Sequence, residues 1–168
     1  MSQIAAIEIR RADPACPSVA PLIEGNQSHG AAETAAESDH TFGAAELSQK
    51  DVRFYAAYRT GASSQDTPLG CGAIKTLSEG SAEVKSVFVS QQARGQGIAR
   101  HLMDHLAGAA RAEGFTTLVL ETGSPLCPGY DAARALYERL GYSYCAPFEG
   151  YKEDPLSVFM RLPLTPAT

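Results

Sequence analysis

Two glycines on a strand-to-helix turn are the residues of this chain with the clearest chemical meaning. Gly95 and Gly97 follow the apolar segment Val87–Val89, and an amphipathic segment begins at Ile98. Glycine lets a backbone approach a ligand closely. The first N–H groups of a helix have no partners within the helix and lie at the positive end of its dipole. This turn therefore predicts a binding site for a pyrophosphate group.

The spacing of the glycines excludes two common phosphate-binding motifs. A dinucleotide-binding fingerprint has a third glycine three residues after the second, where this chain has Arg100, and the Gly-Lys-Ser/Thr of a P-loop is absent. What remains is Gln92-x-x-Gly95-x-Gly97, which resembles the coenzyme A loop of the GNAT superfamily of N-acetyltransferases.

A second segment strengthens this resemblance. An apolar stripe at helical spacing ends at Gly141, a helix-stop residue, and consists of Ala133, Leu136, Tyr137 and Leu140. It is similar to the Ala-x-x-Leu-Tyr-x-x-x-Gly-Phe/Tyr segment of the superfamily. The short apolar run Thr117–Thr122 lies between the two motifs and predicts a buried strand. The order loop, helix, strand, helix is more specific than either motif alone, and the resemblance covers roughly Asp51–Leu162.

The resemblance implies that acetyl-CoA binds along the glycine turn as co-substrate. Backbone groups of Val87, Phe88 and Val89 would hold the pantetheine arm, because this strand splays from its neighbour in the GNAT fold. Family members often carry an asparagine seven residues before the tyrosine, where this chain has Tyr130, and we expect Tyr130 to contact the cofactor. The pyrophosphate would be held by the loop and the start of the helix, which comprise Gln92, Arg94, Gly95, Gln96, Gly97, Ile98, Ala99 and Arg100.

The resemblance also indicates the catalytic groups. Tyr137 occupies the position of the general acid in many GNAT enzymes, and a phenol with an ordinary pKa near ~10 remains protonated at neutral pH. Tyr137 also fits the core stripe of its helix. Glu83 lies where several members carry a carboxylate that takes the proton of the amine, and Glu121, at the end of the next strand, is the alternative base.

Two residues are candidates for acceptor binding. We expect His40 to line the acceptor pocket, because the region between the first helices and the second strand shapes substrate access in the superfamily. Lys85 shares a strand face with Glu83, since side chains two residues apart point the same way. Lys85 could orient the carboxylate of an amino-acid acceptor, or it could merely neutralise Glu83.

Composition limits the classes of function. A chain of 168 residues with 44% hydrophobic residues fits one domain over residues 1–168. The formal net charge is −5 and the basic residues are scattered, which argues against nucleic-acid and membrane partners. Met1–Asp13 has no long apolar run, so we expect a cytoplasmic protein. The cysteines lack Cys-x-x-Cys spacing, which predicts free thiols and no metal site.

The expected fold is an α/β GNAT fold. Its mixed, mostly antiparallel sheet of about seven strands would have helices on both faces and a splayed central strand pair. We expect strands at Ile4–Arg10, Val52–Tyr58, Leu69–Leu77, Ala82–Val89, Thr117–Thr122, Tyr142–Phe148 and Ser157–Leu162. We expect helices at Pro17–Gly30, within Ala31–Lys50, at Gly97–Glu113 and along the stripe that ends at Leu140.

The sequence thus predicts an enzyme that moves an acetyl group from acetyl-CoA to a primary amine of a small molecule, an amino acid being one option. Transfer would be direct, in a ternary complex. The alternatives are a catalytically silent acyl-CoA sensor, which would not require Tyr137 or the carboxylates, and an acetyltransferase acting on protein amines. The sequence leaves a homodimer open.

Overall fold

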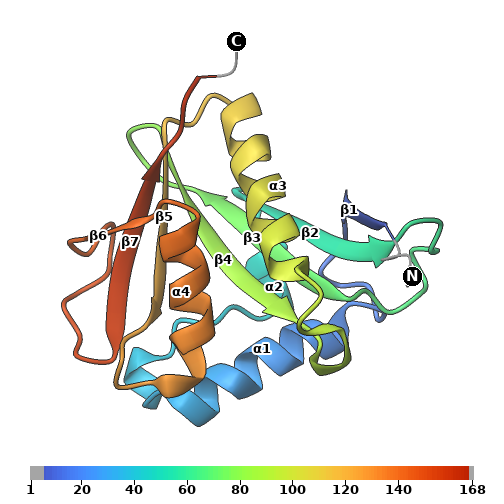
Figure 1. Cartoon of the computed structure of the whole chain (residues 1–168), viewed down its shortest axis with the longest axis horizontal. Coiled ribbons are helices and arrows are strands. Elements are labelled where there is room, and N and C mark those ends of the chain that lie inside the picture. The colour runs from blue at the N-terminus through green and yellow to red at the C-terminus, as the bar shows by residue number, and fades with distance from the viewer. Residues whose placement is uncertain (1–5, 167–168) are drawn as a thin grey trace.

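A seven-stranded sheet forms the centre of the computed structural model, which describes residues 6–166 (Figure 1). The strand order is β1-β2-β3-β4-β5-β7-β6. Only β4 and β5 pair in parallel, and all other neighbours are antiparallel. The strands are β1 (Ile7–Arg11), β2 (Val52–Arg59), β3 (Gly70–Thr76), β4 (Ser81–Val89), β5 (Thr117–Gly123), β6 (Ser143–Cys145) and β7 (Ser157–Pro163). The predicted mixed, mostly antiparallel sheet is confirmed.

Helices cover both faces of this sheet, as predicted. Figure 1 shows α3 and α4 on one face and α1 and α2 on the other. The helices are α1 (Ala20–Glu33), α2 (Ala44–Leu47), α3 (Ile98–Ala112) and α4 (Asp131–Arg139), with 3₁₀ turns at Ala36–Ser38, Gln91–Ala93 and Pro128–Tyr130. None of the helices within residues 6–166 combines the length and the apolar character needed to cross a bilayer.

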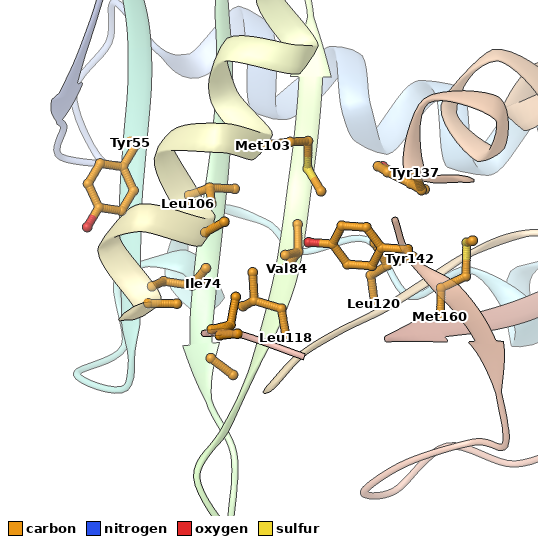
Figure 2. Close-up of a cluster of buried hydrophobic side chains, with 14 residues drawn as sticks. Tyr55, Ile74, Val84, Met103, Leu106, Leu118, Leu120, Tyr137, Tyr142 and Met160 are labelled. Carbon is orange, nitrogen blue, oxygen red and sulfur yellow. The ribbon is translucent and has the colours of Figure 1, made fainter. Parts of the chain in front are cut away.

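Each face of the sheet has its own hydrophobic core. The cluster beneath α3 and α4 includes Ile74, Leu106 and Leu118, all fully buried (Figure 2). The cluster on the other face joins the start of α1 to β2 and β3 and includes Leu22 and Phe54. Two packed faces restrict the places where a ligand can reach the middle of the sheet.

The amphipathic pattern predicted α3 closely. The stripe expected to face the core is buried in full and consists of Ile98, Leu102, Met103, Leu106 and Ala110. Helix α1 begins and ends later than predicted. Pro21 stands in its first turn, where the missing N–H of proline leaves no hydrogen bond unmade, so the helix starts at Ala20 and extends past Gly30 to Glu33.

A bulge in β4 redirects this central strand. Phe88 lies opposite Cys71 and Lys85 lies opposite Ala73, so two residues of β4 face one residue of β3. Ser86, inside the bulge, has a φ of 56°, in the left-handed region that a non-glycine residue rarely adopts. The extra residue changes which side chains face α3, because the alternation restarts after it.

The predicted splayed strand pair consists of β4 and β5. Pairing between β4 and β5 starts at Ser81 with Thr117 and ends at Glu83 with Val119. Beyond this point the two strands diverge toward α1, with α4 crossing in front of the gap (Figure 1). The second half of β4 therefore presents backbone N–H and C=O groups that β5 does not pair.

Two connections differ from the predictions. The segment 31–50, predicted to combine a short helix with an exposed loop, contains the short helix α2, but the chain before it folds inward and buries Ser38. The strand expected over Tyr142–Phe148 is shorter and ends at Cys145. Pro147 follows shortly after and has no N–H to offer a neighbouring strand, so the chain leaves the sheet as a loop. In the first predicted strand, Ile4 lies outside the described residues, and β1 starts at Ile7.

Candidate active site

A cleft of about 650 Å³ lies where β4 and β5 diverge. Its walls come from the connection after α1, the second half of β4, the start of α3, the end of β5 and α4. These elements lie on both faces of the sheet, so the cleft joins the two faces through the gap between the strands. A long ligand could enter beside α3 and reach groups on the α1 side.

The glycine loop forms one end of this cleft. Gly95 has a φ of 79° and Gly97 a φ of 77°, and a Cβ on either would meet no atom within 4 Å. The left-handed backbone explains why glycine occupies both positions, and the open space beside them fits a bulky group at the start of α3. Gln92 and Gln96 are exposed and lie outside the lining. The other predicted cofactor residues line the cleft: Val87, Phe88, Val89, Arg94, Gly95, Gly97, Ile98, Ala99, Arg100 and Tyr130.

Tyr137 is both a core residue and part of the cleft wall. Its side chain extends from α4, is 9% exposed and lies 6.0 Å, centre to centre, from the ring of Tyr142 (Figure 2). Burial, and then the nearby charge of Glu121, raise the pKa of Tyr137 to about 12. The phenol therefore keeps its proton at neutral pH and can donate it.

Glu121 is a half-buried carboxyl group on β5 that faces the cleft. Its one hydrogen bond within the described residues is long, with the Ser157 hydroxyl donating at 3.5 Å. Burial raises the pKa of Glu121 to about 7, against the smaller lowering effect of Lys85. A carboxyl group with this pKa and few partners can take up and release a proton near neutrality.

Glu83 has a different environment. Its carboxylate is almost fully buried, accepts a hydrogen bond from the Tyr151 hydroxyl at 2.6 Å and lies 3.5 Å from the Lys85 ammonium. Lys85 also donates to the Tyr151 hydroxyl oxygen at 3.0 Å and to the His40 carbonyl at 3.1 Å. Glu83 and Lys85 thus form a buried ion pair that Tyr151 bridges.

Two loops cover this ion pair, one containing His40 and the other containing Tyr151. His40 lines the cleft, and its ring meets that of Tyr151 edge-on at 4.9 Å. Burial, and then the charge of Lys85, lower the pKa of His40, so the imidazole is neutral at pH 7. A hydrogen bond from Ser38 to Asp154 joins the two loops a second time. The two loops that cover β4 are therefore joined to each other at two places.

Tyr130 closes the cleft beside α4. Its ring packs edge-on against His29 at 4.7 Å. A Cβ at Gly123 would lie 2.4 Å from this ring, so glycine is required where β5 ends. Arg134, largely buried, donates to the Gly123 carbonyl at 2.7 Å and holds the turn.

The cleft offers no cysteine nucleophile. Cys127 is fully buried in the loop before α4, outside the lining, and burial raises the pKa of its thiol. Across residues 6–166, no three side chains of the metal-binding types gather in a group that could hold an ion. The groups available for chemistry therefore include backbone amides and the side chains of His40, Tyr130, Tyr137, Asp39, Glu83 and Glu121.

Sequence reasoning missed three polar residues of this region. Tyr151 and Asp154 come from the loop before β7, and Arg139 lies at the end of α4. The loop has no periodicity that would indicate which side chains point inward. A possible signal was its aromatic content, since Phe148 and Tyr151 stand in an otherwise polar segment.

Comparison with known proteins decides the family. The model of the acetyltransferase (GNAT) family matches residues 22–142. The chain belongs to the GNAT acetyltransferase family. It is 40% identical to an IAA acetyltransferase of Azospirillum brasilense over 94% of this chain and 98% of that protein. It is 38% identical to the N-acetyltransferase YsnE of Bacillus subtilis over 74% of this chain and 78% of that protein.

A solved structure supports the same assignment for the GNAT chain described here. An acyl-CoA N-acyltransferase from Klebsiella pneumoniae is 34% identical, and its structure superposes with a TM-score of 0.76 over 96% of this chain and 99% of that one. Family membership makes the chain an acyltransferase and confirms the resemblance inferred from the glycine turn and the Tyr137 segment.

Proposed function

We propose that this GNAT protein transfers the acetyl group of acetyl-CoA to a primary amine of a small molecule, by direct attack in a ternary complex. The observation that carries this proposal is the cleft through the parted strands. It leads from the left-handed glycine turn before α3 to Tyr137 and Glu121. The buried position of Cys127 supports direct transfer over a thioester on the enzyme.

The cleft residues fit the donor. Arg94 and Arg100 stand beside the glycine turn, where they would meet phosphate groups. The unpaired half of β4 would bind the pantetheine arm as an added strand. Arg139 on α4 is a third arginine of the cleft wall, and these positive charges suit the several negative charges of coenzyme A. Because the four cysteines are free thiols, we place the reaction in the reducing cytoplasm.

We assign the base to Glu121. Glu121 would take one proton from the acceptor ammonium, and the neutral nitrogen would then bond to the acetyl carbon as the carbon–sulfur bond breaks. Tyr137 would give its proton to the departing thiolate and regain one from the nitrogen, which leaves amide and free thiol as products. Glu83 is less suited to this role, because one of its oxygens already accepts the Tyr151 hydrogen bond and proton uptake would break the ion pair with Lys85.

The proposal is tested by screening amines with acetyl-CoA, following thiol release and identifying the acetylated product by mass spectrometry. The panel would hold alkylamines, diamines, amino acids, a peptide and IAA, the last because the Azospirillum relative is named for it. We expect acetylation of at least one small amine. Coenzyme A binding without turnover on any member would support the sensor alternative, and turnover on the peptide alone would support protein acetylation.

A further inference from the structure

Charged side chains are sorted by sign along the cleft. The cofactor end, formed by the glycine turn and the start of α3, holds Arg94 and Arg100 and no acidic residue of the lining. The opposite end, which we call the acidic end, holds Asp39, Glu83 and Glu121 with the single cation Lys85. Such a field attracts a polyanion to one end and a cation to the other.

The one cation of the acidic end is already engaged by protein groups. Lys85 donates hydrogen bonds to the Tyr151 hydroxyl at 3.0 Å and to the His40 carbonyl at 3.1 Å. Its ammonium also lies 3.5 Å from the Glu83 carboxylate, with which it forms an ion pair. The ring of Phe42 lies 4.1 Å from the ammonium. Lys85 is 7% exposed, so a carboxylate in the cleft would find this charge already enclosed and neutralised.

The remaining acids of the acidic end are less occupied. Asp39 is half-buried, and one of its carboxylate oxygens accepts the Thr41 N–H at 3.0 Å. Glu121 has only the long contact from Ser157. A carboxylate carried by the acceptor would therefore face acidic groups with no cation to pair with, whereas an ammonium group would find acceptors.

A second cavity continues the same pattern. It measures about 570 Å³ and shares Asp39, Glu83 and Lys85 with the cleft. Its further charged lining consists of three acids and one cation, Glu46, Asp51, Glu149 and Lys75. The region on the other side of these shared residues is thus also one in which acids outnumber cations.

We propose, on the basis of the proposed function, that the acceptor is a primary amine with no carboxylate beside its reacting nitrogen, and that a second ammonium group improves it through Asp39. The acceptor class is thus that of alkylamines and diamines, and α-amino acids are excluded. Lys85 serves the buried ion pair with Glu83 and does not recognise a substrate carboxylate.

Four compounds with one carbon skeleton test the proposal. Pentylamine is the reference, norleucine adds a carboxylate next to the nitrogen, norleucinamide adds a neutral group of similar size, and cadaverine adds a distal ammonium group. We expect kcat/KM for norleucine to be about 10²-fold or more below that for pentylamine, because its carboxylate is left unpaired. Norleucinamide should remain close to pentylamine, and cadaverine should exceed it.

Variants assign the effect to residues. Asp39→Asn should remove the advantage of cadaverine over pentylamine, a loss of roughly tenfold for a charged hydrogen bond. Glu153→Gln is the matched control, because Glu153 is exposed on the loop that contains Tyr151 and lies outside the cleft. It should leave the ratio of kcat/KM for cadaverine to that for pentylamine unchanged. Lys85→Met should leave the ratio of kcat/KM for pentylamine to that for norleucine unchanged.

Each contrary result has a distinct meaning. Equal or better turnover of norleucine than of pentylamine would overturn this inference and leave the acetyltransferase proposal intact. Loss of norleucine activity alone in Lys85→Met would return the lysine to carboxylate recognition. Cadaverine no better than pentylamine would remove the role of Asp39. Failure of every amine in the wider panel would overturn the proposed function itself, and this inference with it.

Discussion

Removing one partner of the buried ion pair should lower the free energy of unfolding of the protein substantially. Lys85→Met keeps most of the apolar stem but deletes the ammonium that lies 3.5 Å from Glu83. At an effective dielectric constant of about 20, this distance corresponds to an attraction of roughly 5 kcal/mol. The carboxylate left behind is 4% exposed and, among residues 6–166, keeps only the hydrogen bond from Tyr151.

Desolvation offsets part of that attraction in the intact pair but not in the single variant. Breaking a buried pair from one side typically costs about 3–5 kcal/mol, which is the loss we expect in the free energy of unfolding for Lys85→Met. For a chain of this length, it corresponds to a fall in Tm of about 6–20 °C. Urea unfolding followed by circular dichroism measures the first quantity, and calorimetry the second.

A double variant separates charge from packing. Glu83→Gln combined with Lys85→Met removes both charges, and the glutamine can still accept the Tyr151 hydrogen bond, so most of the lost stability should return. Asp104→Asn, in the exposed pair with Arg100, is the control and should change stability by less than about 1 kcal/mol. A loss below about 1 kcal/mol in Lys85→Met, or additive losses in the double variant, would refute the reasoning.

Four further outcomes are expected. The kcat/KM of the wild type should rise as pH increases through about 7, because Glu121 must lose its proton to act as base, and Glu121→Gln should lack this rise. Tyr137→Phe should lower kcat about 10²-fold in the thiol-release assay with coenzyme A affinity kept, and full turnover would make Tyr137 a packing residue only. Gly97→Glu should abolish coenzyme A binding in calorimetry, because it adds bulk and like charge at a left-handed position, and unchanged affinity in a folded variant would contradict the site. Leu106→Ala, at a fully buried site, should cost about 2–5 kcal/mol in urea unfolding, and a smaller loss would mean that the core relaxes around it.

Local sequence signals predicted those elements whose cause is local. The apolar stripe that begins at Ile98 follows from helical periodicity, and the glycine turn follows from the need for a left-handed backbone. Both could therefore be inferred without knowing which other segments pack against them. The strands predicted at Val52–Tyr58 and Leu69–Leu77 followed in the same way from local apolar runs, and they pair antiparallel as β2 and β3.

Features that depend on tertiary contacts could not be predicted. The bulge at Ser86 places a serine in a left-handed conformation that no residue preference favours, and the surrounding sheet holds it there. The loop containing Tyr151 has no periodic pattern, and its role arises only when Glu83 and Lys85 come beneath it. The short β6 likewise reflects where the chain must leave the sheet.

The two carboxyl groups show why residue type and position do not suffice to assign a base. Glu83 and Glu121 are both glutamates on neighbouring strands, and their side chains both reach the cleft. Lys85 and Tyr151 both contact one oxygen of the first, whereas the second keeps one long contact and has its pKa raised by burial to about 7. A base needs a free lone pair and a pKa near the working pH, and Glu121 meets both conditions. Proton uptake by Glu83 would instead break its ion pair with Lys85. The pH profiles of Glu121→Gln and Glu83→Gln should therefore differ in kind, with the rise through about pH 7 lost only in the first.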